Sequence, residues 1–350
     1  MPSIDKVMLS LLGISLPPDR QETTHLDLML DQMDAKLASL KEVVEPAASS
    51  SPRTPFDTTL PPEEVSFANF SVRQVAKMLP LMAPLAMAMR KSSNYYDGSF
   101  EPSASEASPE FLARLEAGAR ERGAVDLRFV EIPRNAIFAG KGAPGRYAVV
   151  FTVGMDKAKI DTAPSFEAMH AVIAGYRDLA AIANWIADEL RAAGFAGYPG
   201  TALGGLTDYP YLAELAGLGA IGYHGLLIAP DGGARLRLNT VYTNIENLPL
   251  AQTEAHAWVR EFCASCRKCV RKCPADAIYE QPRPRPDGAS QCIDHGTCRD
   301  YFSRNWGCAV CLSVCPFSQA GYDTLRDRFK GNPGAPRFRL PVLGDVAAAE

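Results

Sequence analysis

Apolar residues follow two different periods along this chain. Between residues 23 and 43, Leu26, Leu30, Met33 and Leu37 are three or four positions apart, which predicts an amphipathic helix. The segment EPAASSSPRTPFDTTLPPEE follows, and its Pro and Ser content predicts an irregular connector. From about residue 67 to residue 250, helical patterns alternate with short runs of β-branched and aromatic residues. This alternation predicts an α/β domain with a central sheet flanked by helices.

The clearest strand-like runs are DLRFVEIP, RYAVVFTVG, GLLIAP and RLRLNTVYT. Between the second and third runs, apolar residues with 4-3-4-3-4 spacing predict a long helix that ends at Gly194. Its apolar positions are Val172, Tyr176, Leu179, Ala183, Ile186 and Leu190. The hydroxyl of Tyr176 therefore points inward, either as a core tyrosine bonded to a backbone carbonyl or as a functional group.

The longest apolar run, MLPLMAPLAMAM from Met78 to Met89, has about half of the roughly 20 residues that a membrane-spanning helix needs. We expect this run to be buried in the core. The first 20 residues lack the basic and small-residue features of an export signal. We therefore expect a cytoplasmic protein that has no membrane segment.

Composition divides the chain into parts. A length of 350 residues with 47% hydrophobic and 22% charged residues predicts a folded protein of more than one unit. The net charge of -4 gives no basic surface of the kind that neutralises phosphates, so nucleic acid is not an expected partner. The composition changes to Cys, Arg and Pro near residue 255 and becomes irregular near residue 331. The predicted parts are residues 1–63, 64–255, 256–322 and 323–350.

All nine cysteines lie between Cys263 and Cys315, which favours metal ligation over disulfides in a chain without an export signal. The segment CASCRKCVRKCP has the C-x2-C-x2-C-x3-C-P spacing of bacterial two-cluster ferredoxins, whose fourth cysteine ligates the other cluster. This spacing predicts one [4Fe-4S] cluster bound by Cys263, Cys266, Cys269 and, from the second run, Cys315.

The second run, CAVCLSVCP, supplies Cys308 and Cys311 but has no third cysteine at close spacing. Together with Cys273, this second cluster needs a ligand from upstream, and Cys298 and Cys292 are both candidates. Zinc is the alternative metal, because zinc sites also use C-x2-C pairs. Zinc does not require a tight third cysteine or a Cys-Pro end, so the pattern favours two [4Fe-4S] clusters that transfer single electrons.

Two longer motifs accompany the cysteine runs. CRDYFSRNWGCAVCLSVCPFSQ has a distant cysteine, aromatic residues, a Gly-Cys pair and a Cys-Pro end. LAELAGLGAIGYHGLLIAPDGGARLRLNTVYTNIENLPL has an AGLG turn, a strand and a threonine-containing stretch that ends in Pro-Leu. In this order the two motifs resemble reductive dehalogenases and epoxyqueuosine reductases, and the similarity covers roughly residues 170–320.

The resemblance implies a cobalamin-binding, nitroreductase-like α/β core at 64–255, followed by a ferredoxin-like module with two [4Fe-4S] clusters. It implies base-off cobalamin between these two parts, with electrons passing from the outer cluster to the inner cluster and then to cobalt. It places Cys298 at the distant-ligand position and leaves Cys292 over. The implied ligands of the second cluster are Cys273, Cys298, Cys308 and Cys311.

The resemblance also implies site residues around the cofactor. In reductive dehalogenases a tyrosine at the corresponding place donates a proton to the carbon that loses its halide, which implies this role for Tyr176. A phenol has an ordinary pKa of about 10, so it donates slowly unless a cation stabilises the phenolate. Relatives have Lys or Arg where this chain has Tyr223, next to His224, and both residues are implied at the cofactor site. The candidate cations are His224, Arg235 and Arg237.

We therefore expect a cobalamin-dependent reductase that removes a halide or similar substituent from a small organic substrate. Its electrons would come from an external low-potential donor such as ferredoxin or flavodoxin. Four basic residues among the cysteines form either a solvated face or a docking site for such a donor, namely Arg267, Lys268, Arg271 and Lys272. The alternatives are a non-catalytic iron-sulfur electron-transfer protein, a corrinoid-handling reductase and an epoxyqueuosine reductase-like enzyme.

Overall fold

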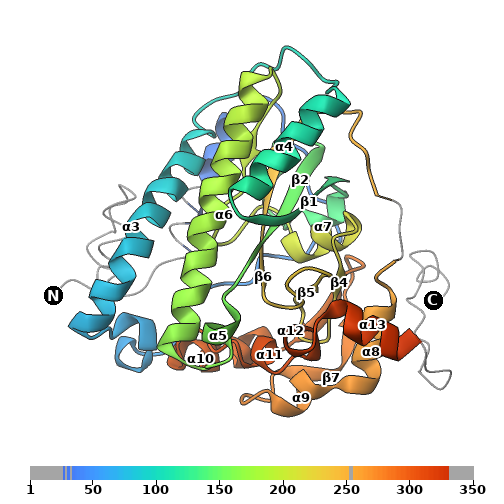
Figure 1. The fold of residues 1–350 in the computed structure, drawn as a ribbon. Coiled ribbons are helices and arrows are strands. Elements are labelled where there is room, and N and C mark those ends of the chain that lie inside the picture. Colours follow the sequence, from blue (N-terminus) through green and yellow to red (C-terminus); the bar gives the residue numbers. More distant parts are fainter. Residues whose placement is uncertain (1–26, 28–29, 32–33, 252–254, 331–350) are drawn as a thin grey trace.

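The computed structural model describes residues 27, 30, 31, 34–251 and 255–330. Its centre is a four-stranded sheet in the order β1-β2-β6-β3, in which every neighbouring pair is antiparallel (Figure 1). The predicted strands at 126–133, 146–154 and 235–243 are confirmed as β1, β2 and β6. The strands of this sheet are β1 (Ala124–Glu131), β2 (Tyr147–Gly154), β3 (Tyr198–Pro199) and β6 (Leu236–Thr243).

Helices cover the sheet, and the two longest, α3 and α6, lie side by side along one flank (Figure 1). The predicted long helix is confirmed as α6, which Ser165 caps and which ends just before Gly194, a glycine with a left-handed φ of 86°. The helices of this part are α3 (Val72–Asn94), α4 (Pro109–Glu121), α5 (Lys157–Ile160), α6 (Phe166–Ala192) and α7 (Tyr209–Leu215).

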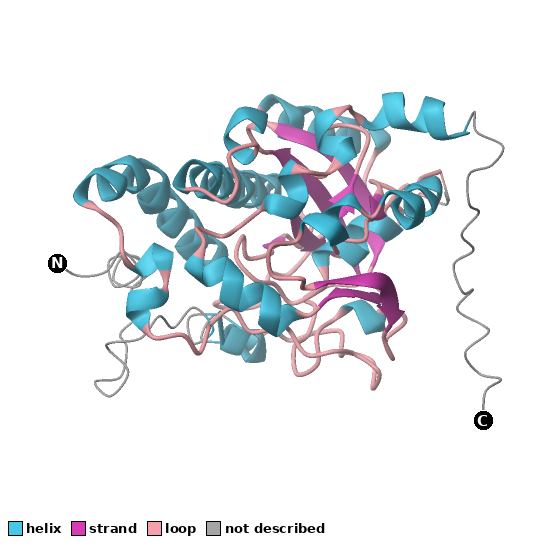
Figure 2. Ribbon diagram, turned by 90° about the horizontal axis from the view of Figure 1, so that it is seen from below, coloured by secondary structure: helices cyan, strands magenta, loops and turns pink. Residues whose placement is uncertain are grey.

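Short helices and two small hairpins form the end of the molecule that Figure 2 views, below the central sheet. The hairpins are β4 (Ala220–Ile221) with β5 (Leu227–Ile228), and β7 (Ile278–Pro284) with β8 (Ser290–Ile293). The helices are α8 (Trp258–Cys266), α9 (Lys268–Lys272), α10 (His295–Arg304), α11 (Val310–Ser313), α12 (Pro316–Gln319) and α13 (Tyr322–Lys330). The short 3-10 helices are η2 (Ala35–Ser39), η3 (Pro62–Glu64), η4 (Ser66–Ala68) and η5 (Arg134–Ala136).

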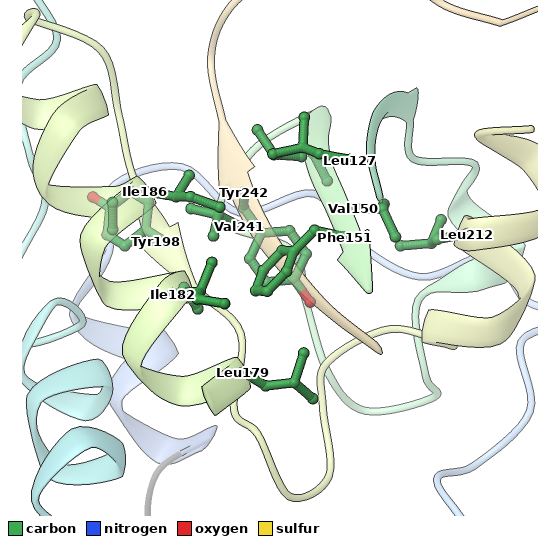
Figure 3. Packing of buried hydrophobic residues seen from close by; sticks show 14 of the residues in the cluster. Leu127, Val150, Phe151, Leu179, Ile182, Ile186, Tyr198, Leu212, Val241 and Tyr242 are labelled. Carbon is green, nitrogen blue, oxygen red and sulfur yellow. The ribbon is translucent and has the colours of Figure 1, made fainter. Parts of the chain in front are cut away.

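The core lies between α6 and the sheet (Figure 3). Six consecutive residues of β2 are buried, from Ala148 to Val153, because α6 covers one face of the strand and α7 contacts it as well. A strand that is covered on both faces reads as a continuous apolar run, which explains the sequence YAVVFTV. This packing fixes α6, and with it Tyr176, against the sheet.

The apolar run Met78–Met89 forms the middle of α3, and the prediction that it is buried is correct for one face of this helix only. Met78, Leu85 and Met89 are buried, whereas the side chains of Leu79 and Met87 are 48% and 67% exposed. A helix that packs on α6 from one side turns its other side to solvent, so an almost wholly apolar sequence still gives a two-faced helix.

The structure tests the predictions for the two ends of the chain only in part. Of the helix predicted at 23–43, residues 23–26, 28–29 and 32–33 lie outside the described residues; residues 27, 30, 31 and 34 are helical, the short helix η2 follows them, and residues 40–43 are not helical. The irregular tail predicted from about residue 331 also lies outside the described residues. Helix α13 continues across the predicted boundary at residue 322, where Tyr322 packs on Trp258. Among the described residues, no helix combines the length and apolar character needed to cross a bilayer.

Candidate functional site

Tight turns bring the cysteines into one region of the structure. Cys263 and Cys266 lie at the end of α8, where Arg267 adopts a left-handed conformation with φ of 45° and the chain turns into α9. Before α11, Cys308 and Ala309 make a second left-handed turn, with φ of 43° and 67°. Such turns are uncommon for residues other than glycine, and each of them lies between closely spaced cysteines.

The first cysteine group comprises Cys263, Cys266, Cys269 and Cys315, the four ligands predicted for one cluster. Burial raises the pKa of the Cys315 thiol to about 12, and the nearby thiols of Cys269 and Cys266 add to this effect. Burial also raises the pKa of Cys263, and Cys315, Cys269 and Cys266 add to that effect. The backbone N–H of Tyr223 donates a hydrogen bond to the sulfur of Cys263. The four thiols therefore share one buried space.

The second group comprises Cys273, Cys298, Cys308 and Cys311. Burial raises the pKa of Cys298 to about 11, and its sulfur neighbours are Cys308 and Cys273. Burial also raises the pKa of Cys311, whose nearest sulfur neighbours are Cys308 and Cys298. The N–H of Ala277 donates to the sulfur of Cys273 over 3.4 Å. Cys298 thus lies with the second run, although it is ten residues upstream of Cys308 in sequence.

Cys292 lies apart from the second group. It is a buried residue of β8, and burial raises the pKa of its thiol to about 11. The charged groups nearest to it are Arg260 and Glu214, its nearby sulfur is that of Cys269, and the N–H of Gly225 donates to it. A ligand position in the second cluster therefore suits Cys298 better than Cys292.

The thiol groups suit iron-sulfur clusters in number and kind. In the part of the chain that the structure describes, no three His, Cys, Asp or Glu side chains converge on the position of one metal ion. A [4Fe-4S] cluster takes one cysteine at each of four irons, so its ligands are more widely spread than those of a single zinc ion. Burial raises the pKa of thiols such as those of Cys315 and Cys298, and ligation would displace their protons, as metal binding to cysteine requires.

A cavity of about 370 Å³ adjoins the first cysteine group. Tyr176 of α6 and Arg237 of β6 line one part of it, and His224, Gly225 and Cys292 line another. His224 also borders the small pocket enclosed by the four cysteines of the first group. The cavity is of a size typical for small-molecule sites, and His224 stands between it and the first group.

Tyr176 and Arg237 contact each other at the cavity wall. The guanidinium carbon of Arg237 lies 4.8 Å from the centre of the Tyr176 ring, which is a cation–π contact. The hydroxyl of Tyr176 has no hydrogen-bond partner among the described residues, so the alternative of a core tyrosine bonded to a carbonyl does not describe it. The Nε atom of Arg237 is buried and also lacks a protein partner within the described chain.

The other two candidate cations are less suited to assist Tyr176. Arg235 donates from Nη1 to the carbonyl of Met155 over 2.8 Å, which directs its guanidinium away to the turn after β2. His224 is fully buried, and burial lowers its pKa to about 4, so the ring is neutral near pH 7. Its Nδ1 accepts a hydrogen bond from the N–H of Leu226, while Nε2 has no partner in the described structure. Arg237 is therefore the cation that the structure places beside the phenol.

The two residues expected at the cofactor site occupy different surroundings. His224 borders the cavity. Tyr223 is 3% exposed and packs in the apolar cluster that also contains Cys263, Cys269 and Cys315, so it lies beside the first cysteine group. His224 thus borders both the cavity and the pocket of the thiols, whereas Tyr223 packs beside the thiols and does not line the cavity.

The cavity also has a wall that sequence reasoning did not anticipate. Arg53 and Phe56, from the predicted Pro/Ser-rich connector, line it together with Phe138 and Tyr209. Arg53 is held by ion pairs to Asp34 at 2.9 Å and Asp31 at 3.1 Å. An irregular segment has no period from which its path could be predicted, and no sequence signal marks these residues.

Part of the sequence is similar to that of known reductases. No family model matches the chain. The chain is 31% identical over 204 residues to the tetrachloroethene reductive dehalogenase of Sulfurospirillum multivorans, a match that covers 56% of this chain and 40% of that protein. It is 33% identical over 119 residues to the epoxyqueuosine reductase of Synechocystis sp., covering 31% and 38% of the two chains. The predicted resemblance to both families is thus confirmed in sequence.

Solved structures agree with this similarity at the level of the fold. A reductive dehalogenase described with a mechanism for B12-dependent dehalogenation superposes with a TM-score of 0.61 over 91% of this chain and 50% of its own, at 17% identity. The catabolic reductive dehalogenase NpRdhA gives a TM-score of 0.58 over 81% of this chain and 45% of its own, also at 17% identity. The chain therefore has a mixed α/β fold similar to that of reductive dehalogenases. It spans about two fifths of the length of the curated dehalogenases that it matches.

Proposed function

We propose that this protein is an oxidoreductase that uses cobalamin and two [4Fe-4S] clusters to remove a halide or similar substituent from a small organic substrate. The observation that carries the proposal is the cavity itself. It is lined by a phenol whose hydroxyl has no partner among the described residues, by a cation against the ring of that phenol, and by a histidine that also borders the pocket of the first four cysteines. The sequence similarity to named dehalogenases and reductases supports the same class of reaction.

The thiols would hold the clusters in two sets. Cys263, Cys266, Cys269 and Cys315 would bind the inner cluster, because their pocket shares His224 with the cavity. The second set would bind the outer cluster, and its members are Cys273, Cys298, Cys308 and Cys311. Cys269 and Cys311 influence each other electrostatically, so the two sets are neighbours. Single electrons would pass from the second set to the first and from there toward the cavity.

His224 and Gly225, on the wall of the cavity closest to the first cysteine group, would contact the corrinoid. A bound corrinoid supplies a cobalt centre that can accept electrons singly and deliver them to an organic substrate. The unpartnered Nε atom of Arg237 and the free hydroxyl of Tyr176 fit such a site, since both require a partner that the described chain does not provide.

Tyr176 would supply the proton of the reaction, in which R–X, two electrons and one proton give R–H and the anion X⁻. Tyr176 lines the cavity and its hydroxyl has no partner among the described residues, so it would donate directly to the carbon from which the substituent leaves. The Arg237 guanidinium, whose carbon lies 4.8 Å from the centre of the Tyr176 ring, would stabilise the phenolate that remains until solvent returns the proton.

The test is turnover by protein reconstituted anaerobically with iron, sulfide and cobalamin. With reduced methyl viologen as reductant, we expect release of one halide for every two viologen radicals oxidised, for at least one member of a panel of halogenated aromatic and aliphatic compounds. Ion chromatography measures the halide, and protein reconstituted without cobalamin is the control.

Two other results would contradict the proposed activity and separate the alternatives. Protein that binds cobalamin and reduces it but releases no substituent from any substrate would be a corrinoid-handling reductase. Protein whose clusters accept electrons without binding cobalamin would be an electron carrier. Because epoxyqueuosine reductases are among the relatives, an epoxide-bearing nucleoside is included in the substrate panel.

A further inference from the structure

A basic face lies over the cysteine-bearing helices. From Arg267 to Arg283 the chain has five basic and two acidic residues, although its overall charge is -4. On α9 the side chains of Lys268, Arg271 and Lys272 are exposed, and Arg283 is exposed on the neighbouring strand β7. We call the surface made by Arg267, Lys268, Arg271, Lys272 and Arg283 the α9 face. Its charge is opposite in sign to that of the whole chain.

Much of this charge is available to a partner. Lys268 and Lys272 form no ion pair with any residue in the described ranges, whereas Arg267 pairs with Glu280 over 3.0 Å. Arg271 donates from Nη2 to the carbonyl of Cys266 over 2.9 Å and has no carboxylate partner within the same ranges. An exposed lysine adds little to the stability of the fold even when it forms an ion pair, because an exposed ion pair contributes roughly 0–1 kcal/mol. Free cations gathered on one short helix are suited to attracting an acidic surface.

The α9 face also has a recess that a partner can enter. A groove of about 630 Å³ runs between α9 and β7, lined by Arg271, Tyr279 and Arg283 among others. The Arg283 guanidinium stacks on the Tyr279 ring at 3.7 Å, which fixes one wall of the groove. Asp276 and Glu280 are the acidic groups along it, and Glu280 is already paired.

Most of the α9 face is formed by a helix that is directly connected to both cysteine groups. Helix α9 carries Cys269 of the first group and is followed at once by Cys273 of the second. A protein docked here is therefore close to both groups, and electron transfer weakens steeply with distance. None of the five basic residues of the α9 face lines the cavity of Tyr176 and Arg237, so docking leaves the substrate's site open.

We propose that the α9 face docks a small acidic one-electron carrier protein that reduces the clusters. This inference rests on the proposed function, because it needs both clusters in place. At each encounter the carrier loses one electron and one cluster gains it, so a two-electron reduction of substrate uses two encounters. No covalent bond forms or breaks at this surface, and the proton is supplied separately at the cavity.

The experiment follows cluster reduction by stopped-flow absorbance in reconstituted protein, so that it requires no substrate. The probes are a reduced acidic plant-type [2Fe-2S] ferredoxin and reduced methyl viologen, a small cation. In the charge-reversed pair Lys268→Glu with Lys272→Glu, we expect the ferredoxin rate constant to fall at least about tenfold at low salt. The viologen rate constant should be unchanged or higher. Salt should slow the ferredoxin reaction of the wild type and have little effect on that of the variant.

Matched controls separate docking from structural damage. The pair Arg90→Glu with Arg114→Glu makes the same charge change on exposed positions of α3 and α4, away from the cysteines, and should leave the ferredoxin rate within about twofold of wild type. The neutral pair Lys268→Gln with Lys272→Gln should give an intermediate rate. Iron content should equal that of wild type in all variants.

Three results would overturn the docking site. These are an unchanged ferredoxin rate in the Lys268 and Lys272 variant, an equal loss in the Arg90 and Arg114 control, and a loss that appears equally with methyl viologen. A wild-type protein that shows no cluster absorbance, or whose clusters methyl viologen does not reduce, would instead overturn the proposed function on which the docking site depends.

Discussion

Replacing Tyr176 by Phe should lower the rate of substituent removal by about 10²- to 10⁴-fold, which is the usual contribution of a positioned acid. Tyr176 lines the cavity, its hydroxyl has no partner in the described part of the chain, and Arg237 lies against its ring, so the substitution would remove the proton donor and keep the ring that packs on the guanidinium. The measurement is kcat for halide release, together with iron and cobalt content per chain. The metal contents should be unchanged.

Variants of Arg237 serve as the companion measurement for this prediction. Arg237→Lys keeps a positive charge near the phenol and should retain more activity than Arg237→Gln, which removes the charge that stabilises the phenolate. If Tyr176→Phe kept more than about half of the wild-type rate, the proton would come from another group. If the Gln and Lys variants of Arg237 were equally active, the guanidinium would serve packing and not charge stabilisation.

Replacing Cys298 by Ser should remove about half of the iron, from about eight to about four irons per chain, because one of two [4Fe-4S] clusters would lose a ligand. In the structure Cys298 has Cys308 and Cys273 as sulfur neighbours, whereas Cys292 lies near Cys269, Arg260 and Glu214. Cys292→Ser is therefore the matched control and should keep about eight irons. Iron and sulfide analysis after anaerobic reconstitution provides the measurement.

The iron contents of these two variants decide between the two candidate ligands. Loss of iron in Cys292→Ser with full retention in Cys298→Ser would assign the ligand to Cys292 and contradict the grouping. Retention of two zinc ions per chain, with no sulfide in the wild type, would show that the thiols bind zinc instead.

Features that depend on local sequence were predictable. The strands β1, β2 and β6 and the helix α6 follow from runs and periods that lie within single segments. The cysteine spacing likewise encodes turns of a few residues. The exposed face of α3 was not predictable from its sequence, because Leu79 and Met87 are as apolar as their buried neighbours. Which face is covered depends on where α6 packs.

The choice among cations required the tertiary structure. Arg235 and Arg237 are two positions apart in the predicted strand run RLRLNTVYT, so the alternation of a strand places them on the same side and does not distinguish them. Only the approach of α6 to β6 shows that Arg237 meets Tyr176, while Arg235 bonds the carbonyl of Met155. The choice between Cys298 and Cys292 also required the tertiary structure, because Cys292 lies in the β7–β8 hairpin, apart from the second run.

The connector predicted at 45–64 takes a larger part in the structure than its composition indicates. Arg53 and Phe56 line the cavity, and Glu64 pairs with Arg304 of α10 at 2.7 Å. Ser66, just beyond it, donates to the carbonyl of Ser303 over 2.9 Å. These contacts join residues more than 200 positions apart, and composition holds no information about such pairings.

The central claim, that one chain holds two clusters and a corrinoid, is tested most directly by elemental analysis of protein reconstituted anaerobically with iron, sulfide and cobalamin and then freed of unbound cofactor. We predict about eight irons and about one cobalt per chain. Eight irons without cobalt would contradict the account and leave an iron-sulfur electron carrier as the better description of this protein.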